Sequence, residues 1–141
     1  MRSLLALALL LAACTDMASP EAPRQHLPRP DAPAFTLLVS NQSFDLSQVD
    51  IEIRIDDQLA VTGDFLVEGQ HTWIPFDFDL APGPHQLRVA SESGGATLEQ
   101  EFDMDARKWG VVSFWYYAAG SPEPTPRQFT FQVLDEEPLF Q

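Results

Sequence analysis

The side chains that could do chemistry in this 141-residue chain are one cysteine, three histidines and 21 carboxylates. The cysteine, Cys14, follows a basic start at Arg2 and the apolar run SLLALALLL, which spans residues 3–11. A positive charge, an apolar stretch and small residues before a cleavage point are typical of a secretory signal. The sequence therefore predicts a signal peptide over residues 1–13, with its cleavage site at Cys14.

Two other structures for the apolar run fit less well. A transmembrane helix needs about 20 apolar residues, and this run has only about half of that. A helix of a folded domain would carry a polar face, which the run lacks. Cys14 also has no second cysteine with which to form a disulfide within the chain, so attachment explains it better than packing does.

The tetrad Leu11-Ala12-Ala13-Cys14 resembles the lipobox of bacterial lipoproteins. The resemblance implies that the Cys14 thiol is lipidated, for example with palmitate, and that Cys14 becomes the new N-terminus. Two or more acyl chains hold a protein stably on a membrane. Thr15 follows the cysteine, and in this respect the chain is similar to lipoproteins sorted to the outer membrane. The expected location is therefore the bacterial cell envelope.

The charge balance restricts the partners. Eight basic residues against 21 acidic ones give a net charge of −13. Such a chain is repelled by the phosphates of nucleic acid, and it has no basic patch for anionic lipid. We therefore expect no nucleic-acid partner, and membrane contact only through the N-terminal lipid.

No constellation for catalysis or for a cofactor emerges from the polar residues. His26, His71 and His85 are far apart, whereas a zinc site needs convergent ligands. Asp77 and Asp79 share one strand face, as do acidic residues at 99, 101 and 103, but any acidic solvent face gives the same pattern. Calcium at Asp56 and Asp57 is conceivable, although no calcium-loop motif is present. We expect neither an enzyme nor a bound metal.

The aromatic residues suggest a binding surface. Trp109, Trp115 and Tyr117 share one parity of the segment WGVVSFWYY, and Trp73 lies elsewhere in the domain. If the opposite parity packs in the core, these four side chains could form a platform for a sugar or a protein partner. The alternative is that they are buried under the loop at residues 118–126 or under the C-terminal tail.

Two segments must position these residues. Residues 14–34 contain five prolines and almost no large apolar side chain, so we expect a disordered, extended tether. Residues 35–141 alternate between apolar and polar residues with a period of two, clearest in the stretch VDIEIRI at 49–55. Seven or eight short strands separated by turns, without a capped helix, predict an antiparallel two-sheet β-sandwich of immunoglobulin-like type.

One stretch carries a family resemblance. The segments IRIDDQ at 53–58 and LAPGPHQLRV at 80–89 resemble a hairpin of PEGA-type and other immunoglobulin-like modules of bacterial surface proteins. The resemblance implies an interaction or spacer role. Three functions remain open from the sequence: a binding or accessory module for a glycan or protein, a structural subunit of an envelope complex, and a hydrolase using surface carboxylates.

Overall fold

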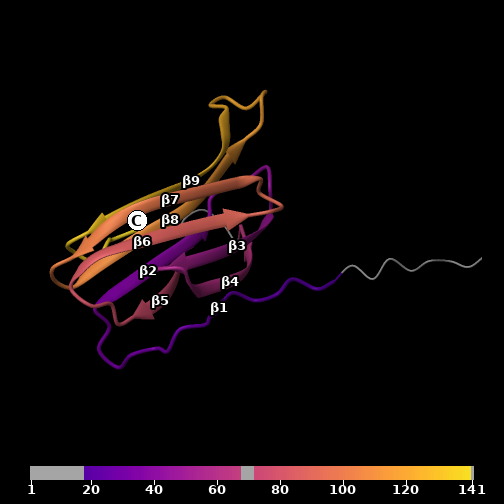
Figure 1. Ribbon diagram of the computed structural model, residues 1–141. Helices are drawn as coiled ribbons and strands as arrows, with labels where there is room; N and C mark the ends of the chain where they lie inside the picture. The colour runs from indigo at the N-terminus through magenta and orange to yellow at the C-terminus, as the bar shows by residue number, and fades with distance from the viewer. Residues whose placement is uncertain (1–17, 68–71, 141) are drawn as a thin grey trace, which may run out of the picture.

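Alternating apolar residues form two stacked β-sheets in a computed structural model that describes residues 18–67 and 72–140 (Figure 1). Cys14 and the predicted signal peptide lie outside the described residues. Within the described ranges, no helix is long and apolar enough to cross a membrane. The nine strands found there are β1 (Arg24–Gln25), β2 (Phe35–Asn41), β3 (Gln48–Ile55), β4 (Gln58–Leu66), β5 (Ile74–Phe78), β6 (Gly83–Ser91), β7 (Ala96–Met104), β8 (Lys108–Tyr117) and β9 (Thr125–Leu134).

The strands confirm the predicted all-β sandwich. One sheet has the order β1-β4-β3-β6-β7, and the other has the order β5-β2-β8-β9. The pairing is mostly antiparallel, as predicted, and β2 and β8 are the pair that runs parallel among the described strands. Since the chain between them passes through the other sheet, β8 returns to β2 by a crossover rather than by a hairpin.

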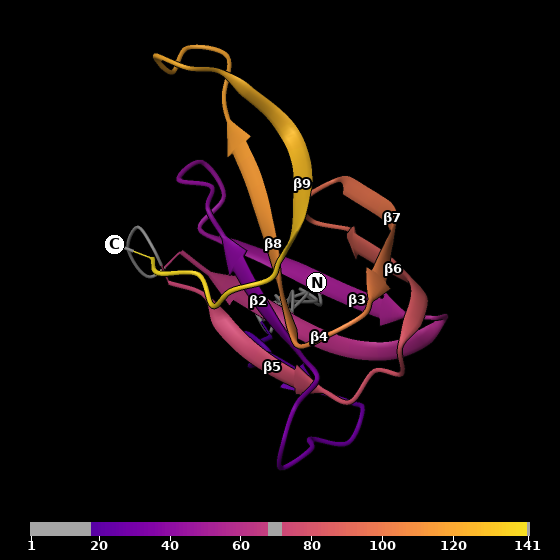
Figure 2. The same cartoon turned by 90° about the vertical axis from the view of Figure 1, so that its left-hand side faces the viewer.

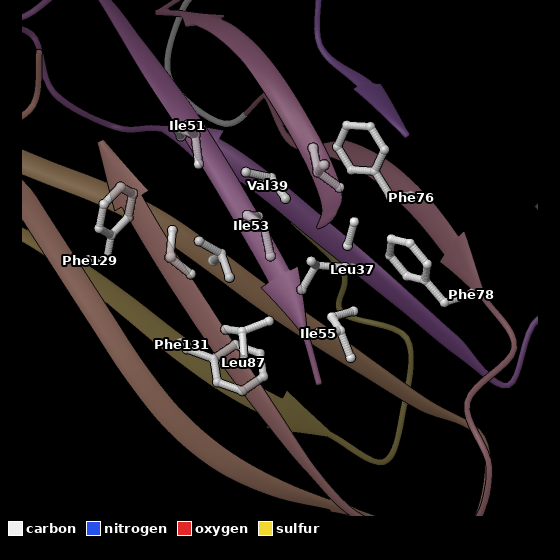
Figure 3. Packing of buried hydrophobic residues seen from close by; sticks show 14 of the residues in the cluster. Leu37, Val39, Ile51, Ile53, Ile55, Phe76, Phe78, Leu87, Phe129 and Phe131 are labelled. Atoms are coloured by element: carbon white, nitrogen blue, oxygen red, sulfur yellow. The ribbon is translucent and has the colours of Figure 1, made fainter. Parts of the chain in front are cut away.

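The core lies between the inward faces of the two sheets (Figure 3). From one sheet, β3 contributes Val49, Ile51, Ile53 and Ile55, each at most 2% exposed. From the other, the inward side chains are mostly phenylalanines, and the Phe35 and Phe102 rings stack across the core with centroids 5.1 Å apart. A period of two places one side chain in this layer and the next outside it. The side chains on the outward faces are therefore the ones that can contact a ligand.

Turn residues fix the strand register where the sequence predicted turns. Asp56 and Asp57 join β3 to β4 with φ angles of 50° and 64°, the left-handed pair that a two-residue hairpin turn requires. Gly95, with φ of 61°, ends the turn between β6 and β7. Asp50 stabilises that turn, because its carboxylate accepts hydrogen bonds from Ser91, Ser93 and the Glu92 amide.

The proline-rich segment before β2 is extended, as expected, but its second half packs on the sandwich. Between Pro23 and Pro28 the chain has backbone donors, and there Arg24 and Gln25 pair with β4 as strand β1. The Gln25 side-chain amide also bonds both backbone groups of Asp77 on β5, donating to the carbonyl at 2.8 Å and accepting from the amide at 3.1 Å. Residues 24–25 thus connect the edges of the two sheets.

Candidate functional site: an aromatic groove on the β8–β9 hairpin

The predicted aromatic side chains lie on the outer face of the sheet that contains β8. Val112 and Phe114 of β8 are fully buried in the core. Trp109, Trp115 and Tyr117 have the opposite parity and are partly exposed. The hairpin that carries them projects beyond the other strands (Figure 2).

Trp115 and Tyr117 line a groove of about 640 Å³ on this hairpin. Their ring centroids are 6.5 Å apart, with the planes inclined at 42°. The rest of the lining comes from the β8–β9 loop and from the outward positions of β9, and consists of Ser121, Pro122, Glu123, Thr125, Gln128, Thr130 and Gln132. The groove therefore combines two aromatic rings with hydroxyl, amide and carboxyl groups.

Hydrogen bonds hold both rings in place. The Trp115 indole Nε1 donates to Thr130 Oγ1 at 3.1 Å, across the hairpin. The Tyr117 hydroxyl donates to the Gln42 carbonyl at 3.1 Å, in the loop after β2. The same loop supports the hairpin a second time, since the Asp45 carboxylate accepts from the Ala118 amide at 2.6 Å. A ligand would therefore meet rings whose orientation is already restricted.

A bulge in β9 shapes the groove. Trp115 pairs with Gln128 and Tyr117 pairs with Thr125, so that Pro126 and Arg127 together oppose a single residue of β8. Proline has no amide proton to donate, and bulges are one of the few places where a strand accepts it. Because the extra residue is on β9, the parity of β8 is kept, and both rings stay on one face.

The other two predicted residues lie outside the groove lining. The Trp109 ring is covered by the Arg107 guanidinium at 4.6 Å from its centroid, near the opposite end of β8. The Trp73 ring stacks on Phe140 of the C-terminal tail, with centroids 3.7 Å apart, and its indole nitrogen lies 3.4 Å from Ser113 Oγ. The tail thus covers part of this face, as one alternative expected, whereas the loop after β8 forms a wall of the groove.

Sequence analysis did not single out the β9 side of the groove. Gln128, Thr130 and Gln132 alternate with the inward residues Phe129, Phe131 and Val133. This alternation places three polar side chains outward. Only the pairing of β8 with β9 places them beside the two aromatic rings.

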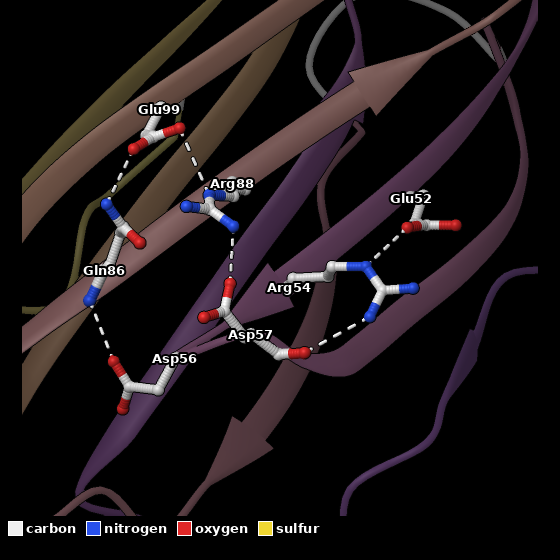
Figure 4. A network of polar contacts seen from close by, with 7 residues as sticks. All are labelled: Glu52, Arg54, Asp56, Asp57, Gln86, Arg88 and Glu99. Atoms are coloured by element: carbon white, nitrogen blue, oxygen red, sulfur yellow. Dashed lines mark hydrogen bonds and ion pairs between the residues drawn. The ribbon is translucent and has the colours of Figure 1, made fainter.

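Several acidic residues on the other sheet take part in a network of surface contacts (Figure 4). Arg88 pairs with Asp57 and, at 3.1 Å, with Glu99. On β5, which belongs to the groove's sheet, the Asp77 carboxylate contacts Thr36 and Arg29. Burial raises the pKa of Asp77, but these hydrogen bonds and the nearby guanidinium groups outweigh it and lower that pKa. A lowered pKa keeps the Asp77 carboxyl ionised, which does not suit a general acid.

Asp56, one of the two residues weighed for calcium, contacts His85. Asp56 bonds His85 Nδ1 at 2.6 Å and the Gln86 amide at 2.9 Å, so its two oxygens point to different partners. No cluster of three or more potential metal ligands occurs within residues 18–67 and 72–140, and His71 lies outside these ranges.

Comparison with known proteins does not add a family to this description. No family model, no curated protein and no solved structure matches the chain significantly. The resemblances to lipoproteins and to PEGA-type modules therefore stay predictions, and the groove beside Trp115 and Tyr117 is the candidate site that the geometry provides.

Proposed function

We propose that this chain is a non-catalytic binding module of a bacterial cell envelope, anchored to a membrane through lipid on Cys14. Its ligand, a glycan or a protein, docks in the groove beside Trp115 and Tyr117. The observation that carries this proposal is the pair of aromatic rings, each fixed by a hydrogen bond, in an open groove on a projecting hairpin. Preformed grooves with a few placed polar groups are the usual form of a ligand site.

The anchor is tested with the precursor. Cells expressing the Cys14→Ser precursor should neither label it with a palmitate analogue nor retain it in the membrane pellet, whereas the unmodified precursor should do both. The reason is that the sulfur carries the acyl chains in the proposed modification. If Cys14→Ser still pellets with membranes, the anchor lies elsewhere in the chain.

The binding site is tested with matched tryptophan variants. Polysaccharide and protein fractions of envelope extracts are passed separately over the immobilised, purified full-length chain, and binding is followed by surface plasmon resonance. Trp115→Ala should abolish the saturable response, and Trp109→Ala should keep it, because both residues lie on one face of β8 but only Trp115 lines the groove. Equal responses from the two variants would reject the groove as the ligand site. A partner that copurifies in stoichiometric amounts would favour a structural subunit of an envelope complex instead.

A further inference from the structure

The lining of the groove has a restricted chemistry. Apart from the two aromatic rings and Pro122, the described side chains that line it carry amide, hydroxyl or carboxyl groups, and Glu123 supplies the carboxyl group. Within the described part of the chain, no alanine, valine, leucine, isoleucine or methionine lines it. The centre of a protein interface is enriched in methionine and arginine beside aromatic residues and is poor in serine and glutamate, whereas this lining includes Ser121 and Glu123. A ligand that fits must be able to stack on rings and form many hydrogen bonds at once.

Sugars have both properties. One face of a pyranose ring presents C–H groups with partial positive charge, which pack favourably against the negative face of an aromatic ring. The edge of the same sugar carries hydroxyl groups that donate and accept hydrogen bonds. The Trp115 and Tyr117 centroids are 6.5 Å apart, a spacing comparable with one sugar unit along a chain.

The charge selects among sugars. The chain as a whole has a net charge of −13, and no arginine or lysine of residues 18–67 and 72–140 lines the groove. Uronic acids or phosphorylated sugars would therefore meet a repulsive field without a local cation to offset it. Neutral sugars meet no such penalty.

From these observations we propose that the groove binds a neutral polysaccharide chain lying along the β8–β9 hairpin. Neighbouring sugar rings stack on Trp115 and Tyr117. The amides of Gln128 and Gln132 bond the sugar hydroxyls. The Thr130 hydroxyl accepts from the Trp115 indole, so it keeps its own proton to donate to a sugar oxygen. This inference rests on the proposed binding function and specifies the class of its ligand.

The test uses the purified full-length chain and defined probes. Neutral hexasaccharides of glucose, xylose, mannose and N-acetylglucosamine are titrated by calorimetry, beside a hexamer of galacturonic acid and a proline-rich peptide. At least one neutral hexasaccharide should bind saturably. Its affinity should fall about tenfold or more in Trp115→Ala and Tyr117→Ala, because each ring supplies a stacking contact. Trp109→Ala should retain the affinity, and Gln128→Ala, which leaves both rings in place, should weaken it by a smaller factor.

Each of the other outcomes contradicts a specific part of the proposal. Binding of the galacturonic acid hexamer at least as tightly as the neutral ones would overturn the charge argument and with it the neutral-chain assignment. If no hexasaccharide binds but the peptide or an envelope protein binds and is lost in Trp115→Ala, the sugar assignment fails and the binding function stands. If nothing tested binds in a manner that depends on Trp115, both fail. Far-ultraviolet circular dichroism and the thermal midpoint of each variant check that the fold is kept.

Discussion

The imidazole of His85 lies between two oxygen atoms. Nδ1 is 2.6 Å from the Asp56 carboxylate, and Nε2 is 2.6 Å from the Ala81 carbonyl. Burial lowers the pKa of His85, but the Ala81 carbonyl and the charges of Asp56 and Asp103 favour the imidazolium and raise the pKa above its ordinary 6.5. The pKa of Asp56 is raised by burial, yet its bonds to the Gln86 amide and to His85 lower it overall, below the ordinary 3.8.

These two shifts predict a stability profile with a maximum in mildly acidic solution. A raised histidine pKa stabilises the folded state fully below the ordinary value, and this contribution is lost as the pH rises through the folded-state pKa. A lowered aspartate pKa contributes above its ordinary value, and this is lost as the pH falls through the folded-state pKa. The urea midpoint should therefore decrease as the pH rises from about 6 to about 8.

The variant His85→Gln isolates the contact. A glutamine keeps hydrogen-bonding capacity but does not titrate, so the decrease above about pH 6 should become smaller in His85→Gln. An unchanged slope in this variant would show that other groups cause the pH dependence.

Single residues also show what the sequence could and could not predict about the site. Parity alone places Trp109, Trp115 and Tyr117 on one face of a strand, and the structure confirms this. It cannot separate Trp115 from Trp109, because the difference comes from side-chain contacts that parity does not specify. Thr130 of the paired strand holds the Trp115 indole, and the Arg107 guanidinium covers the Trp109 ring. The β9 side of the groove depends on strand pairing and a bulge, which local patterns do not specify.

At the scale of the elements, strand β1 and the residues before it can pack against β4 because β4 has a glycine, Gly63, at the point of contact. Gly63 has φ of 147°, and a Cβ added there would lie 2.5 Å from the Pro23 Cα. The packed segment is further held by backbone bonds from His26 to Ala60 and from Asp64 to Glu21. The sequence predicted a free tether because five prolines rarely form a strand. The short donor-bearing stretch and the glycine facing it overrode that tendency.

Gly63→Ala should release this segment while the sandwich stays folded. The amide of His26 should then exchange with deuterium much faster, and the free energy of unfolding should fall by about 1–3 kcal/mol. Gly83→Ala is the matched control, because Gly83 also has a positive φ, 116°, but open space around its Cβ position. Similar exchange rates of the His26 amide in both variants would mean that backbone strain, and not the contact with Pro23, releases the segment.

The whole molecule carries a net charge of −13 on a small domain, and this must cost stability through self-repulsion. Salt screens charges separated by more than about 10 Å at 0.1 M, whereas the direct ion pairs of the β3–β6–β7 face are exposed and contribute little. The thermal midpoint should therefore rise when sodium chloride is increased from about 0.01 M to about 0.2 M. A lower midpoint at the higher concentration would show that the local pairs outweigh the repulsion.

The fold as a whole followed from the period-two pattern, because alternation and turn residues are local signals. The parallel β2–β8 pair was not predicted. Residues 35–41 form this pair with residues 108–114. A local pattern does not predict pairing between segments so far apart in the sequence.

The packed segment also sets how far the domain can stand from a membrane. Under the proposed anchorage, Cys14 and Glu21 are seven residues apart, which spans about 20 Å at most in an extended chain. A pull that peels β1 from β4 and also breaks the contacts of Arg29 with Asp77 and of Pro33 with Arg107 would free the chain up to residue 34, and the maximal reach would grow to about 60 Å. With the segment packed, the groove would stay close to the lipid surface. With the segment released under force, the groove would reach ligands farther from that surface.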